Sequence, residues 1–233
     1  MSYKQIDASW DSKLIKRRST PQSVTITTPD LFTKYYPLPI NMDWDKYYSD
    51  RDAFYNRIPS PLSGKLLYRI PPYDYMGRSF FRPGMIACIN EKVLDIFRRL
   101  KVNRDEYCVK PIVIDGVTEP YYILFFPFIS HLCDSGILWS DSIFRDRYTK
   151  ECFVFNNREE YCLRKASDKS FESVKIVLPG HYKKRDILSF AFSSVQDLVS
   201  DRIVDAFGQE GIVGVTFNNM GTTFVGIDAN SSW

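Results

Sequence analysis

The sequence predicts an α+β fold with mostly antiparallel sheet and a few amphipathic helices. Short apolar segments typical of strands outnumber the helical patterns, and short turns join most of them. Two stretches, Cys88–Phe97 and Leu198–Phe217, also share one pattern: an apolar run, a capping residue and an amphipathic helix. We therefore expect two loosely repeated strand–helix–strand units.

The composition is that of a folded protein. The chain has 233 residues, of which 44% are hydrophobic and 25% are charged. No apolar run approaches the ~20 residues that a membrane-spanning helix needs, and Pro127 interrupts the longest one, Tyr121–Ile129. The start, MSYKQIDASW, lacks an apolar signal core. We expect a cytoplasmic protein without a membrane segment.

The first third of the chain differs from the rest. Nine of the 13 prolines lie in residues 1–83, and 13 aromatic residues lie between Phe32 and Phe81. Proline disfavours long helices, whereas a high density of aromatic residues requires burial. We expect a flexible segment over 1–20 and a single α+β domain over 21–233, in which 21–83 wraps around 84–233. Within 21–83, one helix is expected in Asp43–Ile58 and one strand over Gly64–Ile70.

The first of the two units begins with a strand over Gly84–Ile89. Asn90 is a suitable N-cap for a helix over Glu91–Leu100, because its side-chain oxygen can accept from a free amide of the first turn. Strands over Val109–Asp115 and Pro120–Phe128 follow, with the turn DGVTEP between them.

The second half is predicted in the same way. Glu151–Asn157 and Glu159–Lys165 are expected to form a hairpin, and Ser173–Leu178 a further strand. Ser200 then caps a helix that starts at Asp201 and ends near two glycines. Strands over Ile212–Phe217 and Thr222–Ile227 close the chain, with NNMG as the turn between them.

The sequence carries no recognised catalytic or cofactor motif. GxxxxGK[ST], GxGxxG, HExxH and GxSxG are all absent, and the five cysteines are scattered without a CxxC pair. With only two histidines, a catalytic group would centre on His131 with Cys133 and Asp134, which are too close in sequence for known triads. We therefore predict a non-enzymatic protein with no catalytic, cofactor-binding or metal-binding residues and no cofactor.

A partner-binding surface is predicted in the segment His131–Arg147. Trp and Arg are frequent in interface hot spots, and acidic residues around an aromatic side chain would suit a basic partner such as a nuclease toxin. The alternative is that the two aromatic residues of this segment, Trp139 and Phe144, are core residues of a loop or short helix. The predicted partner-binding residues are Asp134, Trp139, Asp141, Phe144 and Asp146.

The stretch LVSDRIVDAFGQEGIVGVTF resembles the sequence motif near the end of the proteins of one family of bacterial immunity proteins. Members of this family protect cells from polymorphic or contact-delivered toxins. A looser similarity to the same family is found in three further stretches: GMIACINEKVLDIF, EPYYILFF and the stretch from Asp134 to Ser140. The resemblance implies that the protein neutralises a cognate toxin by binding it, without catalysis. It transfers no set of binding residues to this chain.

Two other interpretations stay open at the level of sequence. One is a nucleic-acid-associated module that uses Arg17, Arg18 and the cluster Lys183–Arg185, although the net charge of +3 is too balanced to predict this binding by itself. The other is an enzyme with an unrecognised site near His131.

Overall fold

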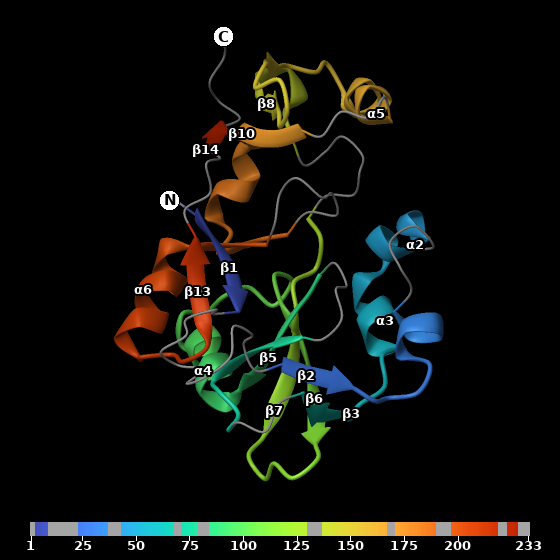
Figure 1. Ribbon diagram of the computed structural model, residues 1–233, viewed down its shortest axis with the longest axis vertical. Coiled ribbons are helices and arrows are strands. Elements are labelled where there is room, and N and C mark those ends of the chain that lie inside the picture. The colour runs from blue at the N-terminus through green and yellow to red at the C-terminus, as the bar shows by residue number, and fades with distance from the viewer. Residues whose placement is uncertain are drawn as a thin grey trace.

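The computed structural model describes residues 3–8, 23–36, 43–67, 71–78, 84–129, 137–166, 171–189, 197–218 and 223–227. In these residues helices stand between groups of strands along the chain, and most strand pairings are antiparallel. The predicted α+β class is therefore confirmed. Figure 1 shows how helices flank the sheets.

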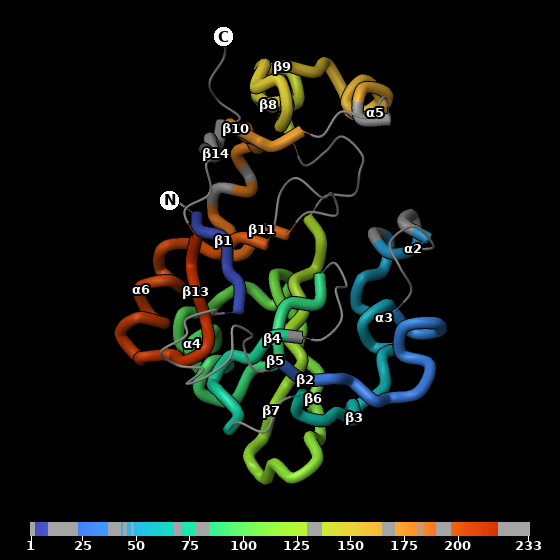
Figure 2. The backbone as a smooth tube through the Cα atoms, in the orientation of Figure 1, coloured from blue at the N-terminus to red at the C-terminus, as the bar shows by residue number. Residues whose placement is uncertain are grey.

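Six strands form a barrel, closed in the order β2-β3-β6-β7-β5-β4, at the lower end of the view in Figure 1. The strands are β2 (Ser23–Ile26), β3 (Leu62–Leu66), β4 (Tyr75–Arg78), β5 (Met85–Asn90), β6 (Cys108–Ile114) and β7 (Tyr121–Phe125). Two of the pairings, β2 with β4 and β3 with β6, are parallel. The strands β2, β3 and β4 come from the proline-rich region, so part of that region is built into the barrel (Figure 2). This differs from the expectation that 21–83 wraps around 84–233.

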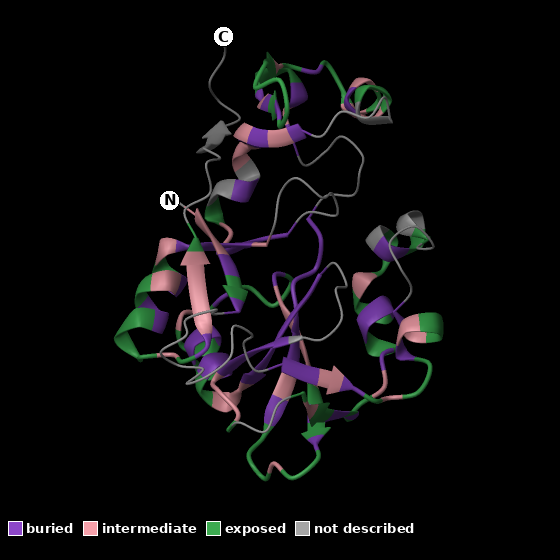
Figure 3. Ribbon diagram, in the orientation of Figure 1, coloured by how far each residue is buried: buried purple, intermediate pink, exposed green. Residues whose placement is uncertain are grey.

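Strand β5 is buried on both faces. Met85 and Cys88 pack into the barrel interior, whereas Ala87 and Ile89 pack into a second core outside the barrel. A strand covered on both sides needs no polar face, which explains the unbroken apolar run of this segment. Figure 3 shows the buried residues along the barrel strands and the exposed ones on the outer side of the helices.

The second sheet has the order β11-β12-β1-β13. Its strands are β11 (Ile187–Leu188), β12 (Leu198–Ser200), β1 (Tyr3–Ala8) and β13 (Val215–Asn218). The expected flexible start is wrong for residues 3–8, since β1 lies inside this sheet with an antiparallel partner on each side. The remaining residues of the predicted flexible segment lie outside the described part of the chain.

Two helices pack together over the second core, α4 (Glu91–Arg99) and α6 (Asp201–Gln209). Both match the predicted amphipathic helices, and Phe97 stacks on Phe207 at their contact. Asn90 caps α4 as expected, by accepting from the Val93 amide at 3.3 Å. Ser200 stands at the start of α6 but makes no side-chain cap, because its hydroxyl donates to Asp186 instead. None of the described helices combines the length and apolar character needed to cross a membrane.

The two strand–helix units correspond in their backbone connections. The amide of Asn90 donates to the Asp74 carbonyl at 3.0 Å, and the amide of Ser200 donates to the Asp186 carbonyl at 2.8 Å. After each helix one residue takes a left-handed conformation, with φ of 54° at Lys101 and 60° at Gly211. The backbone therefore enters and leaves the two helices in the same way, although only Asn90 caps its helix with its side chain.

The third sheet has the order β14-β10-β8-β9. Its strands are β8 (Ile143–Asp146), β9 (Cys152–Phe153), β10 (Phe171–Pro179) and β14 (Thr223–Ile227). The expected hairpin of the last two strands of the chain does not form: β13 pairs with β1 in the second sheet, whereas β14 runs parallel to β10. The two predicted strands thus belong to different sheets.

The predicted strand over Glu159–Lys165 is wrong, because this stretch lies in helix α5 (Arg158–Ala166). Asn157 starts the helix by accepting from the Glu160 amide at 2.9 Å. The Glu160 carboxylate in turn accepts from the Asn156 amide at 2.9 Å. This is close to a capping box, a sequence signal for a helix start that outweighs the strand propensity of the segment.

The predicted helix in Asp43–Ile58 is divided into α2 (Trp44–Ser49) and α3 (Arg51–Asn56). The break falls at Asp50, whose carboxylate accepts from the Ala53 amide at 2.8 Å and caps α3. Short helical turns complete the described elements at Leu31–Tyr35 (η1), Trp139–Asp141 (η4) and Gly180–Lys184 (η5).

Candidate functional site

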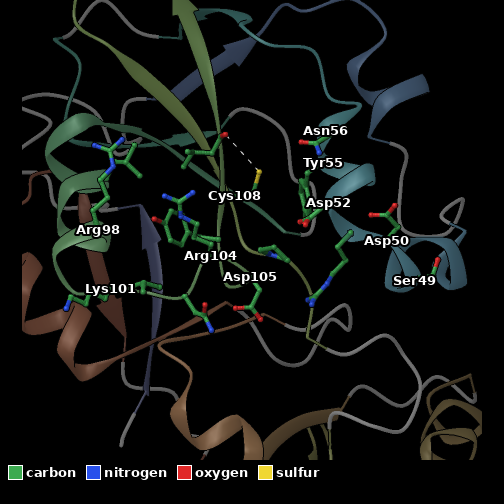
Figure 4. Close-up of a pocket in the computed structure, with 17 residues that line it drawn as sticks. Ser49, Asp50, Asp52, Tyr55, Asn56, Arg98, Lys101, Arg104, Asp105 and Cys108 are labelled. Carbon is green, nitrogen blue, oxygen red and sulfur yellow. Dashed lines mark hydrogen bonds between the residues drawn. The ribbon is translucent and has the colours of Figure 1, made fainter.

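A cleft of about 850 Å³ lies between the α2–α3 pair and the connection from α4 to β6. Charged and polar side chains form most of its lining, and Figure 4 shows how they face the open space. One side is lined by Ser49, Asp50, Arg51, Asp52, Tyr55 and Asn56. The other side and the floor are lined by Leu94, Arg98, Lys101, Val102, Asn103, Arg104, Asp105, Tyr107, Cys108, Val109 and Pro127.

Buried tyrosines fix the α2–α3 side of the cleft to the barrel. The Tyr47 hydroxyl accepts from the Phe128 amide at 3.0 Å and lies 3.2 Å from the Tyr55 hydroxyl. Phe54 packs edge-on against both tyrosines. Helix α3 buries Phe54 and Tyr55 against the fold. The adjacent face of the helix carries Arg51 and Asp52 and lines the cleft.

The opposite side is built by the end of α4 and the residues after it. Arg98 contacts Glu91 and also pairs with Asp95 at 2.7 Å, so its charge is balanced within its own helix. The chain then turns at Lys101, whose φ is 54°. Lys101 and Arg104 are exposed, and neither has an ion-pair partner among the described residues.

A polar network behind the cleft holds this connection in place. Asp105 pairs with Arg185 at 2.9 Å. The buried Glu106 carboxylate accepts from the amides of Asp186 and Ile187 at 2.7 and 2.8 Å. Burial raises the pKa of Glu106, against the opposing effect of these two amides and of Arg185. The cleft is therefore bounded by a connection tied to the second sheet.

Cys108 lies on the floor of the cleft and donates weakly to the Val109 carbonyl at a sulfur–oxygen distance of 4.0 Å (Figure 4). Burial raises the pKa of its thiol; Lys110 opposes this effect and Asp52 adds to it. A thiol with a raised pKa is a poor nucleophile near neutral pH, because little thiolate is present. The geometry thus gives Cys108 no activation.

The structure does not gather the predicted partner-binding residues on one exposed surface. Trp139 and Phe144 are 8% and 0% exposed and stack in the interior with centroids 5.5 Å apart. Asp146 is also buried and accepts from the amides of Tyr148 and Thr149, which shapes the turn after β8. Asp141 is exposed, and Asp134 lies outside the described residues.

The physical reason for this burial is an aromatic core beneath the third sheet. Phe155, Tyr161 and Phe171 surround Phe144, with centroids 5.2 to 5.6 Å apart in neighbouring pairs. A Trp and a Phe beside such a cluster bury more apolar area inside it than they could at a rim. The aromatic residues of this segment are core residues.

The other residues singled out in the sequence lie mostly beyond the described ranges. His131, Cys133, Arg17 and Arg18 fall outside them, as does the side chain of Lys183. Lys184 is exposed, and Arg185 is committed to Asp105. Within the described residues no group of three or more His, Cys, Asp or Glu side chains is placed to hold a metal ion.

Sequence reasoning missed the cleft. Its signal is the segment KVNRDEY, where charged residues concentrate between an amphipathic helix and a strand. Connections of this kind often carry binding residues. No protein-family model matches the chain, and a comparison with curated proteins finds no match.

Proposed function

We propose that this protein is an immunity protein, which binds a cognate toxin protein and blocks it without catalysing a reaction. The resemblance of LVSDRIVDAFGQEGIVGVTF to the ending of such proteins motivates the class of partner. The observation that carries the proposal is the cleft beside α3 and α4, because its polar and charged lining supports a protein partner.

Three properties of the cleft support a protein partner. Small-molecule sites are mostly apolar and enclose their ligand, whereas protein interfaces have a polar rim and are enriched in Arg and Tyr. Here exposed charged residues from three separate segments surround the space, with Tyr55 and Tyr107 among its lining. The network through Glu106 holds the backbone of one wall in place, so association does not have to order that connection.

We further propose that the protein acts in the cytoplasm, where an immunity protein would meet a toxin that has entered the cell. The four described cysteines, Cys88, Cys108, Cys152 and Cys162, are free thiols, which suits a reducing compartment.

The proposal is tested with the protein encoded by the neighbouring gene. Cells that express this neighbour alone should stop growing, and co-expression of the wild-type chain should restore growth. The two proteins should also co-purify in a fixed ratio. Restored growth without a complex between the two proteins contradicts neutralisation by binding, and failure to restore growth contradicts the immunity function.

A further inference from the structure

The charges of the cleft are not equally available to a partner. Arg98 is balanced by Glu91 and Asp95, and Asp105 by Arg185. The Asp50 carboxylate is occupied as the cap of α3. Besides Asp50, the charged side chains that line the cleft and have no ion-pair partner among the described residues are Arg51, Asp52, Lys101 and Arg104.

With Asp50 included, three cations and two acids of the lining have no ion pair among the described residues, which leaves a net positive charge of one. Figure 4 shows Lys101 and Arg104 on the α4 side of the cleft and Asp52 on the α3 side. Asp52 also contributes to the raised pKa of Cys108 on the floor, which places its charge close to the interior of the cleft. A ligand that approaches the α4 side meets cations first.

We propose that the cleft binds an acidic segment of the toxin, with carboxylates of that segment on Lys101, Arg104 and Arg51. This inference rests on the proposed function and specifies the chemistry of its partner. Carboxylates pair well with guanidinium and ammonium groups, and unpaired cations at an interface rim speed the association of a negatively charged partner. The charge of this proposed partner segment is opposite to that of the basic partner expected from the segment His131–Arg147.

A nucleic acid fits the same cleft less well. A phosphate backbone presents closely spaced negative charges that need a continuous stripe of cations. Asp50 and Asp52 interrupt any such stripe here, because both line the cleft and neither has an ion-pair partner among the described residues. A protein segment can place its carboxylates opposite the cations and leave the acids of the cleft facing neutral groups.

The test measures association of the neighbouring gene's product with the wild-type chain and with two cleft variants, Arg104→Glu and Lys101→Asn. Asparagine is chosen for Lys101 because it tolerates the left-handed backbone there. Lys150→Asn is its matched control, since Lys150 is also an exposed lysine, with φ of 63°. Lys65→Glu, an exposed position on β3, is the control for charge reversal.

Each cleft variant should slow association by about tenfold at low salt, and the controls should stay within about twofold of the wild type. Asp52→Asn should have the opposite effect and speed association by about two- to threefold, because it removes a repulsive carboxylate. A faster variant cannot be explained by misfolding. Circular dichroism and thermal unfolding check that the slower ones are folded.

The inference is overturned if the wild type binds and the cleft variants bind equally well, or if the controls lose binding to the same extent. It is also overturned if a fluorescent DNA duplex or RNA strand binds the wild-type cleft and displaces the protein partner. In these cases the proposed function still stands. Absence of wild-type binding contradicts the proposed function, and this inference falls with it.

Discussion

Phe97 of α4 and Phe207 of α6 stack with ring centroids 6.0 Å apart and ring planes 26° apart. Each occupies the same position in its own strand–helix unit, and both are fully buried. The stacked pair joins the barrel half of the fold to the second sheet, since α4 follows barrel strand β5 and α6 follows β12.

Truncation of either ring should therefore destabilise the whole fold. Phe97→Ala and Phe207→Ala are each expected to lower the free energy of unfolding by about 3–5 kcal/mol, because a large buried ring leaves a cavity. The double variant should cost less than the sum, since the two rings share one contact. Urea denaturation measures all three values. Leu163→Ala, at a position 73% exposed, is the control and should change stability by less than about 0.5 kcal/mol.

The buried Glu106 should be sensitive to the loss of its acceptor oxygens. Glu106→Ala leaves the amides of Asp186 and Ile187 without this acceptor and should lower the free energy of unfolding by about 1–3 kcal/mol. Glu106→Gln keeps an acceptor oxygen and should cost less. Equal losses for the two variants in chemical denaturation would contradict this role for the carboxylate.

The same residue predicts a pH dependence. Because burial raises the pKa of Glu106 in the folded state, the folded protein binds this proton more tightly than the unfolded chain. The contribution of Glu106 to stability is therefore greatest below its ordinary pKa of 4.5 and falls as the pH rises through the folded value. Denaturation of the wild type and Glu106→Gln across pH 4.5 should show the free energy of unfolding of the wild type fall relative to that of the variant as the pH rises. If the free energies of unfolding of the wild type and Glu106→Gln change with pH in parallel, ionisation of Glu106 does not contribute to the pH dependence of stability.

Thiol reactivity should follow burial. Cys152 is exposed and should react before the other three described cysteines with a thiol reagent, whereas Cys88 is fully buried and should react only on unfolding. Burial also raises the pKa of Cys88, so little thiolate forms at neutral pH. Mass spectrometry of the labelled chain, with and without denaturant, measures the order. Rapid labelling of Cys88 in the native protein would be inconsistent with the barrel interior.

Trp139 and Asp141 should separate stability from binding. Trp139→Ala is expected to lower the free energy of unfolding by about 3–5 kcal/mol, because Trp139 packs within the aromatic core of the third sheet. Asp141→Ala should change it by less than about 0.5 kcal/mol, since Asp141 is exposed. If the cleft is the binding surface, Asp141→Ala binds the partner as the wild type does. A loss of affinity in a folded Asp141→Ala protein would return the binding surface to this segment.

The local signals of the sequence were sufficient for helices α4 and α6. Each starts after a residue type that favours N-caps and has an acidic first turn and one apolar face, and these features can be read from neighbouring residues. Helix α5 was missed although its signal is also local. Asn157 and Glu160 form its start, but the alternating apolar pattern of the segment favoured a strand.

The arrangement of the strands could not be predicted, because it depends on contacts between distant segments. β1 pairs with β12 and β13, which lie at the other end of the chain, and β2 pairs in parallel with β4. The role of Ser200 also depends on a residue outside its helix, since its hydroxyl donates a hydrogen bond to the Asp186 carboxylate. Composition likewise cannot distinguish a buried Trp139 from an exposed one, because the same residue types suit a core and an interface.

The most direct test of partner binding is a calorimetric titration of the neighbouring gene's product into the wild-type chain. The account predicts a saturable isotherm with one defined stoichiometry and an affinity that weakens as salt is added, because the available charges of the cleft are exposed. A titration without binding heat at several temperatures, together with separate elution of the two proteins on gel filtration, would contradict it.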